Sequence, residues 1–276
     1  MTQPAPILSL DCVSKRFGGL QCIDELSFSV PAGSRTALIG PNGAGKTTVF
    51  NLITGVFAPD SGCIRVAGID ITGLASRLRI RHGVARTFQN VRLMRHLTTL
   101  ENVMVGQHWY SAGWRGILKP LRLSKSSGGR EEARAALADA GLAEHEHAMV
   151  GSLPYGVQKR IEVVRALLAR PRLLLLDEPA AGLNPAETEA LQLQLENICR
   201  RAGVSLLVVE HDMQFVSALC NHVIVVSFGR KIAEGSADAI RSNTQVQEVY
   251  LGTSRPGGQG KPELPLQERR RAARRA

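Results

Sequence analysis

The residues most able to do chemistry lie in the segment GPNGAGKTT, residues 40–48. Residues 40–47 fit the pattern G-x-x-x-x-G-K-[ST], whose glycines let backbone N–H groups approach phosphate oxygens closely. Lys46 would reach the β- and γ-phosphates, and the hydroxyl of Thr47 would bind Mg²⁺. The candidate nucleotide-binding residues are Gly40, Pro41, Asn42, Gly43, Ala44, Gly45, Lys46, Thr47 and Thr48. Kinases, GTPases, DNA-repair ATPases and membrane pumps all use such a loop, so it does not choose among them.

Two carboxylates follow a run of four leucines in LLLLDEP, residues 173–179. This run has the length of a buried strand, and its carboxyl end would lie beside the phosphate loop, where ligands bind in parallel sheets. We expect Asp177 to hold Mg²⁺ through water and Glu178 to be the general base that polarises the attacking water. The alternative, a surface turn with two carboxylates, is disfavoured by the leucine run.

The surrounding segments predict an α/β fold with a mainly parallel sheet. RTALI, RLLLLDEP, SLLVVEHD and HVIVVSFG are predicted strands that alternate with helices, including an amphipathic helix that Gly203 is placed to end. ILSLDCVSKRF, FSVPAG and PDSGCIRVAGIDIT predict antiparallel strands near the N-terminus. From about residue 74 to 169 the spacing is helical, and KSSGGR, residues 125–130, is interpreted as a loop.

The composition is that of an ordinary α/β protein. The chain has 276 residues and a net charge of +10, but residues 255–276 carry seven Lys or Arg against two Glu, so half of that charge is local. Five cysteines form no C-x-x-C pair and are expected to be reduced core thiols. No apolar run has the length of a membrane span and no signal peptide is recognised, so we expect a cytosolic protein.

Four further motifs come in a fixed order along the chain and carry a resemblance. They are Gln89 in ARTFQN, the run LPYGVQKRIEVVRALLARP, AAGLNP, and His211 in VVEHD. With the two motifs above they resemble the nucleotide-binding subunits of ABC transporters. The resemblance covers residues 7–252 and implies a P-loop NTPase (RecA-like) core, an N-terminal antiparallel β subdomain and an inserted α-helical subdomain at about 90–165. Residues 253–276 are expected to be a flexible basic tail.

The resemblance also implies roles for single residues. Gln89 would contact Mg²⁺ and the water, His211 would contact the γ-phosphate, and Phe17 would stack on adenine. Without the resemblance, the residue types would favour a structural role for each: Gln89 hydrogen-bonded within the chain, His211 at the edge of the core, and Phe17 buried. The ligands implied are ATP and Mg²⁺.

The family's dimer places each ATP between the phosphate loop of one subunit and the signature segment of the other. Here the signature departs from the common L-S-G-G-Q, because Pro154, Tyr155 and Val157 replace Ser, Gly and Gln, and only Gly156 keeps an open backbone. Proline also removes an N–H donor. Ser152 could compensate, and Asn184 stands where Asp is usual. We hypothesise two ATP sites of unequal activity.

The form L-x-Y-G-x-Q, together with the segment around Gln89 and the closing VQEVYLG, resembles the Liv-type importers of branched-chain amino acids and their relatives for urea and amides. That family implies a second, non-identical ATPase, two permeases and a periplasmic binding protein, with this subunit peripheral on the cytoplasmic face of the inner membrane.

Other classes stay open: a lipopolysaccharide-export ATPase, a non-transport ABC ATPase acting on nucleic acid, or a P-loop kinase. Pro154 and Tyr155 count against the export ATPase, which resembles proteins with an intact signature. The single cassette counts against the nucleic-acid ATPase. A kinase needs a site for the phosphate acceptor, and no motif for one is recognised. The basic tail could bind nucleic acid or anionic lipid, but a solvated tail is the favoured interpretation. No residue of this sequence identifies the transported molecule, because an ATPase subunit does not contact it.

Overall fold

The central element is a sheet of six strands in the order β10-β9-β3-β8-β7-β6. The computed structural model describes residues 5–107 and 127–251, so the predicted tail at 253–276 lies outside the described residues. Neighbouring strands are parallel except for the antiparallel β9–β10 pair, which confirms the predicted parallel sheet. The strands are β3 (Arg35–Ile39), β6 (Val84–Arg86), β7 (Leu173–Asp177), β8 (Ser205–Val209), β9 (His222–Ser227) and β10 (Arg230–Gly235).

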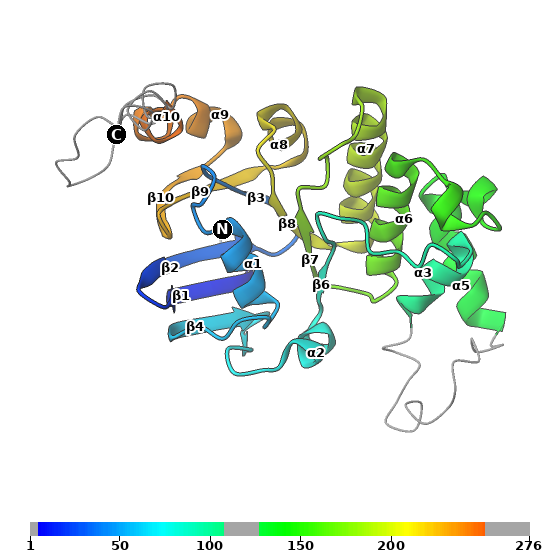
Figure 1. The fold of residues 1–276 in the computed structure, drawn as a ribbon, viewed down its shortest axis with the longest axis horizontal. Coiled ribbons are helices and arrows are strands. Elements are labelled where there is room, and N and C mark those ends of the chain that lie inside the picture. The colour runs from blue at the N-terminus through cyan, green and yellow to red at the C-terminus, as the bar shows by residue number, and fades with distance from the viewer. Residues whose placement is uncertain (1–4, 108–126, 252–276) are drawn as a thin grey trace, which may run out of the picture.

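A second, antiparallel sheet of order β2-β1-β4-β5 faces the first. Helix α1 (Lys46–Ile53) shares one hydrophobic core with both sheets, and Figure 1 shows it beside β1 and β2. The predicted N-terminal strands and hairpin are therefore confirmed. The strands are β1 (Pro6–Phe17), β2 (Leu20–Pro31), β4 (Ser61–Val66) and β5 (Ile69–Asp70).

Helices cover the other face of the six-stranded sheet. Successive residues of each central strand contribute alternately to the two cores, because side chains of a strand alternate between its faces. Phe215 and Leu219 of α8 and Leu191 and Leu195 of α7 bury the second face. The covering helices are α6 (Tyr155–Leu167), α7 (Pro185–Ala202), α8 (Met213–Leu219), α9 (Ala237–Arg241) and α10 (Thr244–Leu251).

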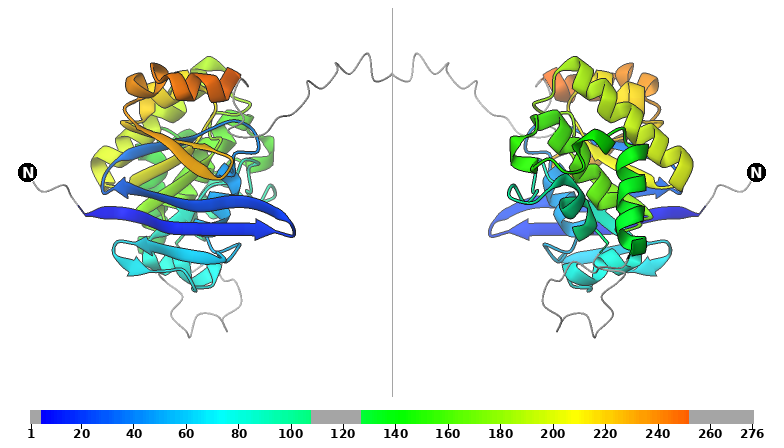
Figure 2. Two further views of the ribbon diagram at one scale, coloured as in Figure 1. Left: turned by 90° about the vertical axis from the view of Figure 1, so that its left-hand side faces the viewer. Right: turned by 90° about the vertical axis from the view of Figure 1, so that its right-hand side faces the viewer.

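A helical region with its own core lies at the end of the molecule opposite the antiparallel sheet (Figures 1 and 2). It contains α3 (Thr99–Val105), α5 (Ser127–Asp139) and α6, and the short α2 (Ser76–Arg79) precedes it in the chain. The loop predicted at residues 125–130 is wrong from Ser127 onward, because α5 begins there. Its glycines occupy the first turn of a helix, where the amides lack intrahelical partners in any case.

Local signals explain where the long helix α7 begins and ends. Asn184 caps its N-terminus in a reciprocal pair with Glu187, Pro185 follows at the first position, and Gly203 ends the helix in the left-handed conformation. The predicted stop at Gly203 is thus confirmed.

The five cysteines differ in how far they are exposed to solvent. Of the five cysteines only Cys220 is buried, and Cys12 is exposed at an irregularity of β1, so the prediction of core thiols is wrong for Cys12.

Within residues 5–107 and 127–251, no helix combines the length and apolarity that crossing a bilayer requires.

Candidate functional site

The phosphate loop joins the end of β3 to the start of α1. Gly40, Gly43 and Gly45 have φ angles of 155°, 81° and 100°, which favour glycine. A Cβ atom on Gly40 would lie 2.1 Å from the carbonyl oxygen of Val226, so the neighbouring strand also excludes a side chain there. The loop leads directly into α1, so the N–H groups at the start of the helix face the same space.

Lys46 lies over this loop. Its Nζ atom donates to the carbonyl oxygens of Gly40 at 2.7 Å and Pro41 at 3.0 Å. Burial lowers the pKa of Lys46, while the nearby Glu178 and Asp177 raise it. The ammonium is therefore partly desolvated beside two carboxylates, in a position where a bound phosphate would interact with it strongly.

Thr47 and Thr48 follow in the first turn of α1. Thr47 is exposed, whereas Thr48 is half-buried. The hydroxyl of Thr47 is thus accessible to a ligand in front of the loop.

Asp177 and Glu178 lie at the carboxyl end of β7, as predicted. Asp177 is buried and forms an ion pair of 2.6 Å with Arg86, which also donates to Asn51 of α1 at 2.7 Å. Glu178 has a φ of 47°, and its N–H donates to the carbonyl oxygen of Val209 at 2.9 Å. Sequence reasoning missed Arg86, although it lies in the same ARTFQN motif as Gln89.

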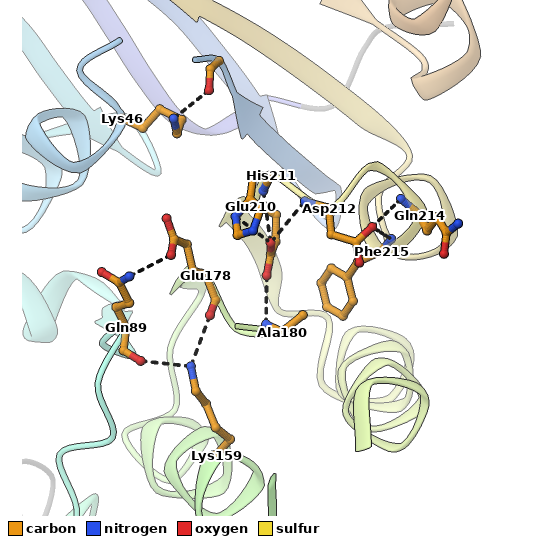
Figure 3. A network of polar contacts seen from close by, with 11 residues as sticks. Lys46, Gln89, Lys159, Glu178, Ala180, Glu210, His211, Asp212, Gln214 and Phe215 are labelled. Carbon is orange, nitrogen blue, oxygen red and sulfur yellow. Dashed lines mark hydrogen bonds and ion pairs between the residues drawn. The ribbon is translucent and has the colours of Figure 1, made fainter. Parts of the chain in front are cut away.

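Gln89 comes from the segment after β6 and meets Glu178. The Nε2 atom of Gln89 donates to Oε2 of Glu178 at 2.8 Å, so two predicted site residues are brought together (Figure 3). Lys159 of α6 donates to the main-chain oxygens of both residues, at 3.0 Å for Gln89 and 3.1 Å for Glu178. No signal in the sequence pointed to Lys159.

His211 follows β8, the strand between β7 and β3. Its side chain is 68% exposed, so it is open to a ligand or to another chain. The buried carboxylate of Glu210 accepts from the N–H groups of His211 at 3.1 Å and Ala180 at 2.8 Å. Glu210, which sequence reasoning missed, thus fixes the main chain beside His211 and after Glu178.

Two predicted residues, Phe17 and Gly156, have their closest contacts with other parts of the chain. Phe17, at the end of β1, is 39% exposed, and its ring packs edge-on against Phe57 with 4.9 Å between centroids. Gly156 lies in the first turn of α6, where an added Cβ would come within 2.5 Å of the Glu187 carboxylate. Gly156 therefore contacts α7, on the helical side of the molecule.

A glycine-rich loop between a parallel strand and a helix, with an acidic pair at the end of a strand of the same sheet, defines the class of P-loop nucleotide hydrolases. A family model described as "ABC transporter" matches residues 23–181, and one described as "Branched-chain amino acid ATP-binding cassette transporter" matches residues 230–255. The chain belongs to the ATP-binding cassette family of ABC transporters, whose cassettes bind and hydrolyse ATP.

Curated relatives match over nearly their full length. The high-affinity branched-chain amino acid transport ATP-binding protein BraF of Pseudomonas aeruginosa is 40% identical over 250 residues, which cover 90% of this chain and 98% of BraF. The corresponding protein LivG of Escherichia coli K12 is 39% identical over the same shares. A solved ATP-binding cassette in its ADP conformation is 30% identical, with a TM-score of 0.81 over 90% of this chain and 99% of that one.

Proposed function

We propose that this chain is the ATP-hydrolysing subunit of an importer for branched-chain amino acids, or for related amino acids, urea or amides. The observation that carries the proposal is the contact of Glu178 with Gln89 at the sheet edge that bears the phosphate loop. The similarity to BraF and LivG, together with the match at residues 230–255, supports the class of cargo. We take residues 7–252 as the ATP-binding domain and about 90–165 as its helical subdomain.

In this mechanism the loop holds the phosphates of ATP. Lys46 exchanges its bonds to the Gly40 and Pro41 carbonyls for bonds to the β- and γ-phosphates, and Phe17 stacks on adenine. Glu178 accepts a proton from the attacking water, which Gln89 contacts, while the water oxygen bonds to the γ-phosphorus and ADP leaves. His211 contacts the γ-phosphate.

The residues around the loop also suit Mg²⁺. Thr47, Gln89 and Asp177 offer hydroxyl, amide and carboxylate oxygens, the ligands this ion prefers. Phosphate oxygens and water would complete the shell, because Mg²⁺ usually keeps several waters and binds substrate phosphates. Bound there, Mg²⁺ would neutralise charge that develops on the phosphates.

ATP binding would close two cassettes around two nucleotides, and hydrolysis would let them reopen. The partners proposed are a second, non-identical ATPase, two permeases and a periplasmic binding protein, with this chain on the cytoplasmic face of the inner membrane. Nucleic acid is not among them. A cavity of about 380 Å³, lined in part by Arg86, Phe88, Glu162 and Arg165, lies beside the Gln89 segment and gives a permease a place to act on it.

Two substitutions test the assignment in the assembled transporter. Lys46→Ala is expected to weaken ATP binding and abolish uptake, because it removes the phosphate-binding ammonium. Glu178→Gln is expected to retain ATP but lower kcat by at least about a hundredfold, because the base is lost. ATP binding, phosphate release and uptake of labelled leucine, isoleucine and valine measure these effects.

The matched control is Glu234→Gln, which alters an exposed carboxylate that pairs with Lys231 on the same strand. This variant should behave as the wild type does. Unimpaired hydrolysis by Glu178→Gln would refute the assigned base. Hydrolysis without uptake of the three amino acids would exclude them as the cargo and leave the related amino acids, urea and amides.

A further inference from the structure

Lys159 is a buried cation in the middle of α6. Its side chain and main chain together are only 4% exposed, and burial lowers its pKa against the opposing effect of nearby carboxylates such as Glu162 and Glu210. Its hydrogen bonds in the described structure go to the main-chain oxygens of Gln89 and Glu178. Burying an ammonium is costly unless it is bonded, so these two contacts fix the side chain in place.

The two carbonyl groups belong to the residues whose side chains meet at the hydrolytic centre. Lys159 therefore joins the main chains of Gln89 and Glu178, which are separated by 89 positions, directly behind their 2.8 Å side-chain contact (Figure 3). Glu178 also has a φ of 47°, a conformation that costs free energy for a residue with a side chain. A charged donor to its carbonyl oxygen helps to hold this conformation.

The same helix begins with the signature segment. The ring of Tyr155 lies 5.6 Å from Nζ of Lys159, and its hydroxyl approaches the carbonyl oxygen of Gln89 at 3.5 Å. A Cβ atom on Gly182, in the segment after Glu178, would lie 3.3 Å from the Tyr155 ring. The start of α6 thus touches both segments that Lys159 holds.

We propose that Lys159 is a positioning residue that couples the signature end of α6 to Gln89 and Glu178 of the same chain. The inference rests on the proposed function, in which the signature segment faces a nucleotide held by the partner cassette. A nucleotide there displaces the start of α6, and the helix moves as one body with Lys159. Its ammonium then shifts the main chains of Gln89 and Glu178, so the state of one ATP site adjusts hydrolysis at the other.

The test compares Lys159→Met, which keeps the unbranched apolar stem but removes the ammonium, with Lys159→Arg, which keeps charge and donors. In the assembled transporter, Lys159→Met is expected to lower kcat by about tenfold or more, because small misplacements of reacting groups are costly, with KM within about twofold. Lys159→Arg should recover part of kcat. Lys231→Met, at an exposed lysine paired with Glu234, is the control.

Hydrogen–deuterium exchange of the full chain without nucleotide supplies a readout that does not depend on activity. Lys159→Met should speed exchange in residues 84–92 and 173–183 and leave β1 and β2 unchanged. If Lys159→Met does not fold, Lys159→Gln, which removes the charge and shortens the side chain but keeps polar donors, carries both measurements and should change the same two segments in the same direction. Unchanged exchange there, or equal kcat for wild type and variant, would overturn the proposal.

A double-mutant cycle tests the coupling itself. The effect of Pro154→Ser on hydrolysis should differ between the wild-type and Lys159→Met backgrounds, whereas additive effects would exclude coupling through Lys159. A wild-type complex that hydrolyses no ATP would refute the proposed function instead, and the exchange measurement would still judge the contacts of Lys159.

Discussion

At the scale of single residues, the proposed nucleotide site uses groups that differ in how firmly they are held. Lys46 and Gln89 are bonded within the chain, to the Gly40 carbonyl and to Glu178 respectively. Phe17 and His211 are instead open to solvent: the whole residue is 39% exposed for Phe17, and the side chain is 68% exposed for His211. Ligand binding must therefore break contacts for the first pair, whereas the second pair gains contacts that are new.

Phe17→Ala tests the proposed stacking on adenine. Losing one aromatic contact of about 1 kcal/mol should weaken ATP binding about fivefold and leave kcat at saturating ATP nearly unchanged. Isothermal titration calorimetry on the full chain measures the affinity. Leu20→Ala, an exposed apolar residue paired with Phe17 across the β1–β2 turn, is the control. Equal affinities for wild type and Phe17→Ala would remove Phe17 from the site.

At the scale of elements, the position of α1 depends on a buried arginine at its far end. The NH1 group of Arg79 donates to the carbonyl oxygens of Leu52 at 2.6 Å and Ile53 at 2.8 Å, which end the helix that starts at Lys46. Other nitrogens of Arg79 donate to the carbonyls of Leu74 and Thr72, both at 3.0 Å. Arg79 thus holds the helix behind the phosphate loop against the chain that leads to β6.

Arg79→Met is expected to lower the free energy of unfolding by about 3 kcal/mol, because buried carbonyl groups lose their donors. Urea denaturation followed by circular dichroism measures the change. The neighbouring Arg77→Met alters an exposed side chain of the same helix α2 and should change stability by less than about 0.5 kcal/mol. Equal midpoints for the two variants would show that Arg79 does not hold α1.

At the scale of the whole molecule, the proposed dimer would share each ATP site between two cassettes. The loop follows β3, and Glu178 and His211 follow the ends of β7 and β8 at the carboxyl edge of the central sheet. The signature residues Pro154 and Gly156 lie at the start of α6, a helix that Figure 1 shows beside α3 and α7. Pro154 caps α6 without a side-chain hydrogen bond. The hypothesis of two unequal ATP sites remains a prediction.

Replacing Pro154 by Ser and Tyr155 by Gly restores the usual signature, and it is expected to raise hydrolysis of the assembled complex about twofold, because a phosphate donor is added at the weaker site. Pro154→Ser alone separates the two effects, since Tyr155 also packs beside Gly182 and Lys159. Steady-state phosphate release measures both variants. A rate that stays at the wild-type value in each would argue against unequal sites.

The sequence by itself determined the phosphate loop, the acidic pair, most strands and the end of α7 at Gly203. Each of these depends on residues close together in the chain, such as Lys46 after Gly45 or Gly203 after the last turn of a helix. The glycines and the leucine run are local signals, so they predict these features without knowledge of which helices and strands pack together.

Only the tertiary structure decided which distant groups support that site. Arg86 meets Asp177 across 91 positions and Lys159 meets Gln89 across 70, and the buried carboxylate of Glu210 holds the main chain at Ala180, 30 positions away. Partner choice for a buried charge depends on which strands and helices become neighbours, and no local pattern records that. These side chains look ordinary in the sequence because the desolvation that makes their bonds necessary arises only when the chain has folded.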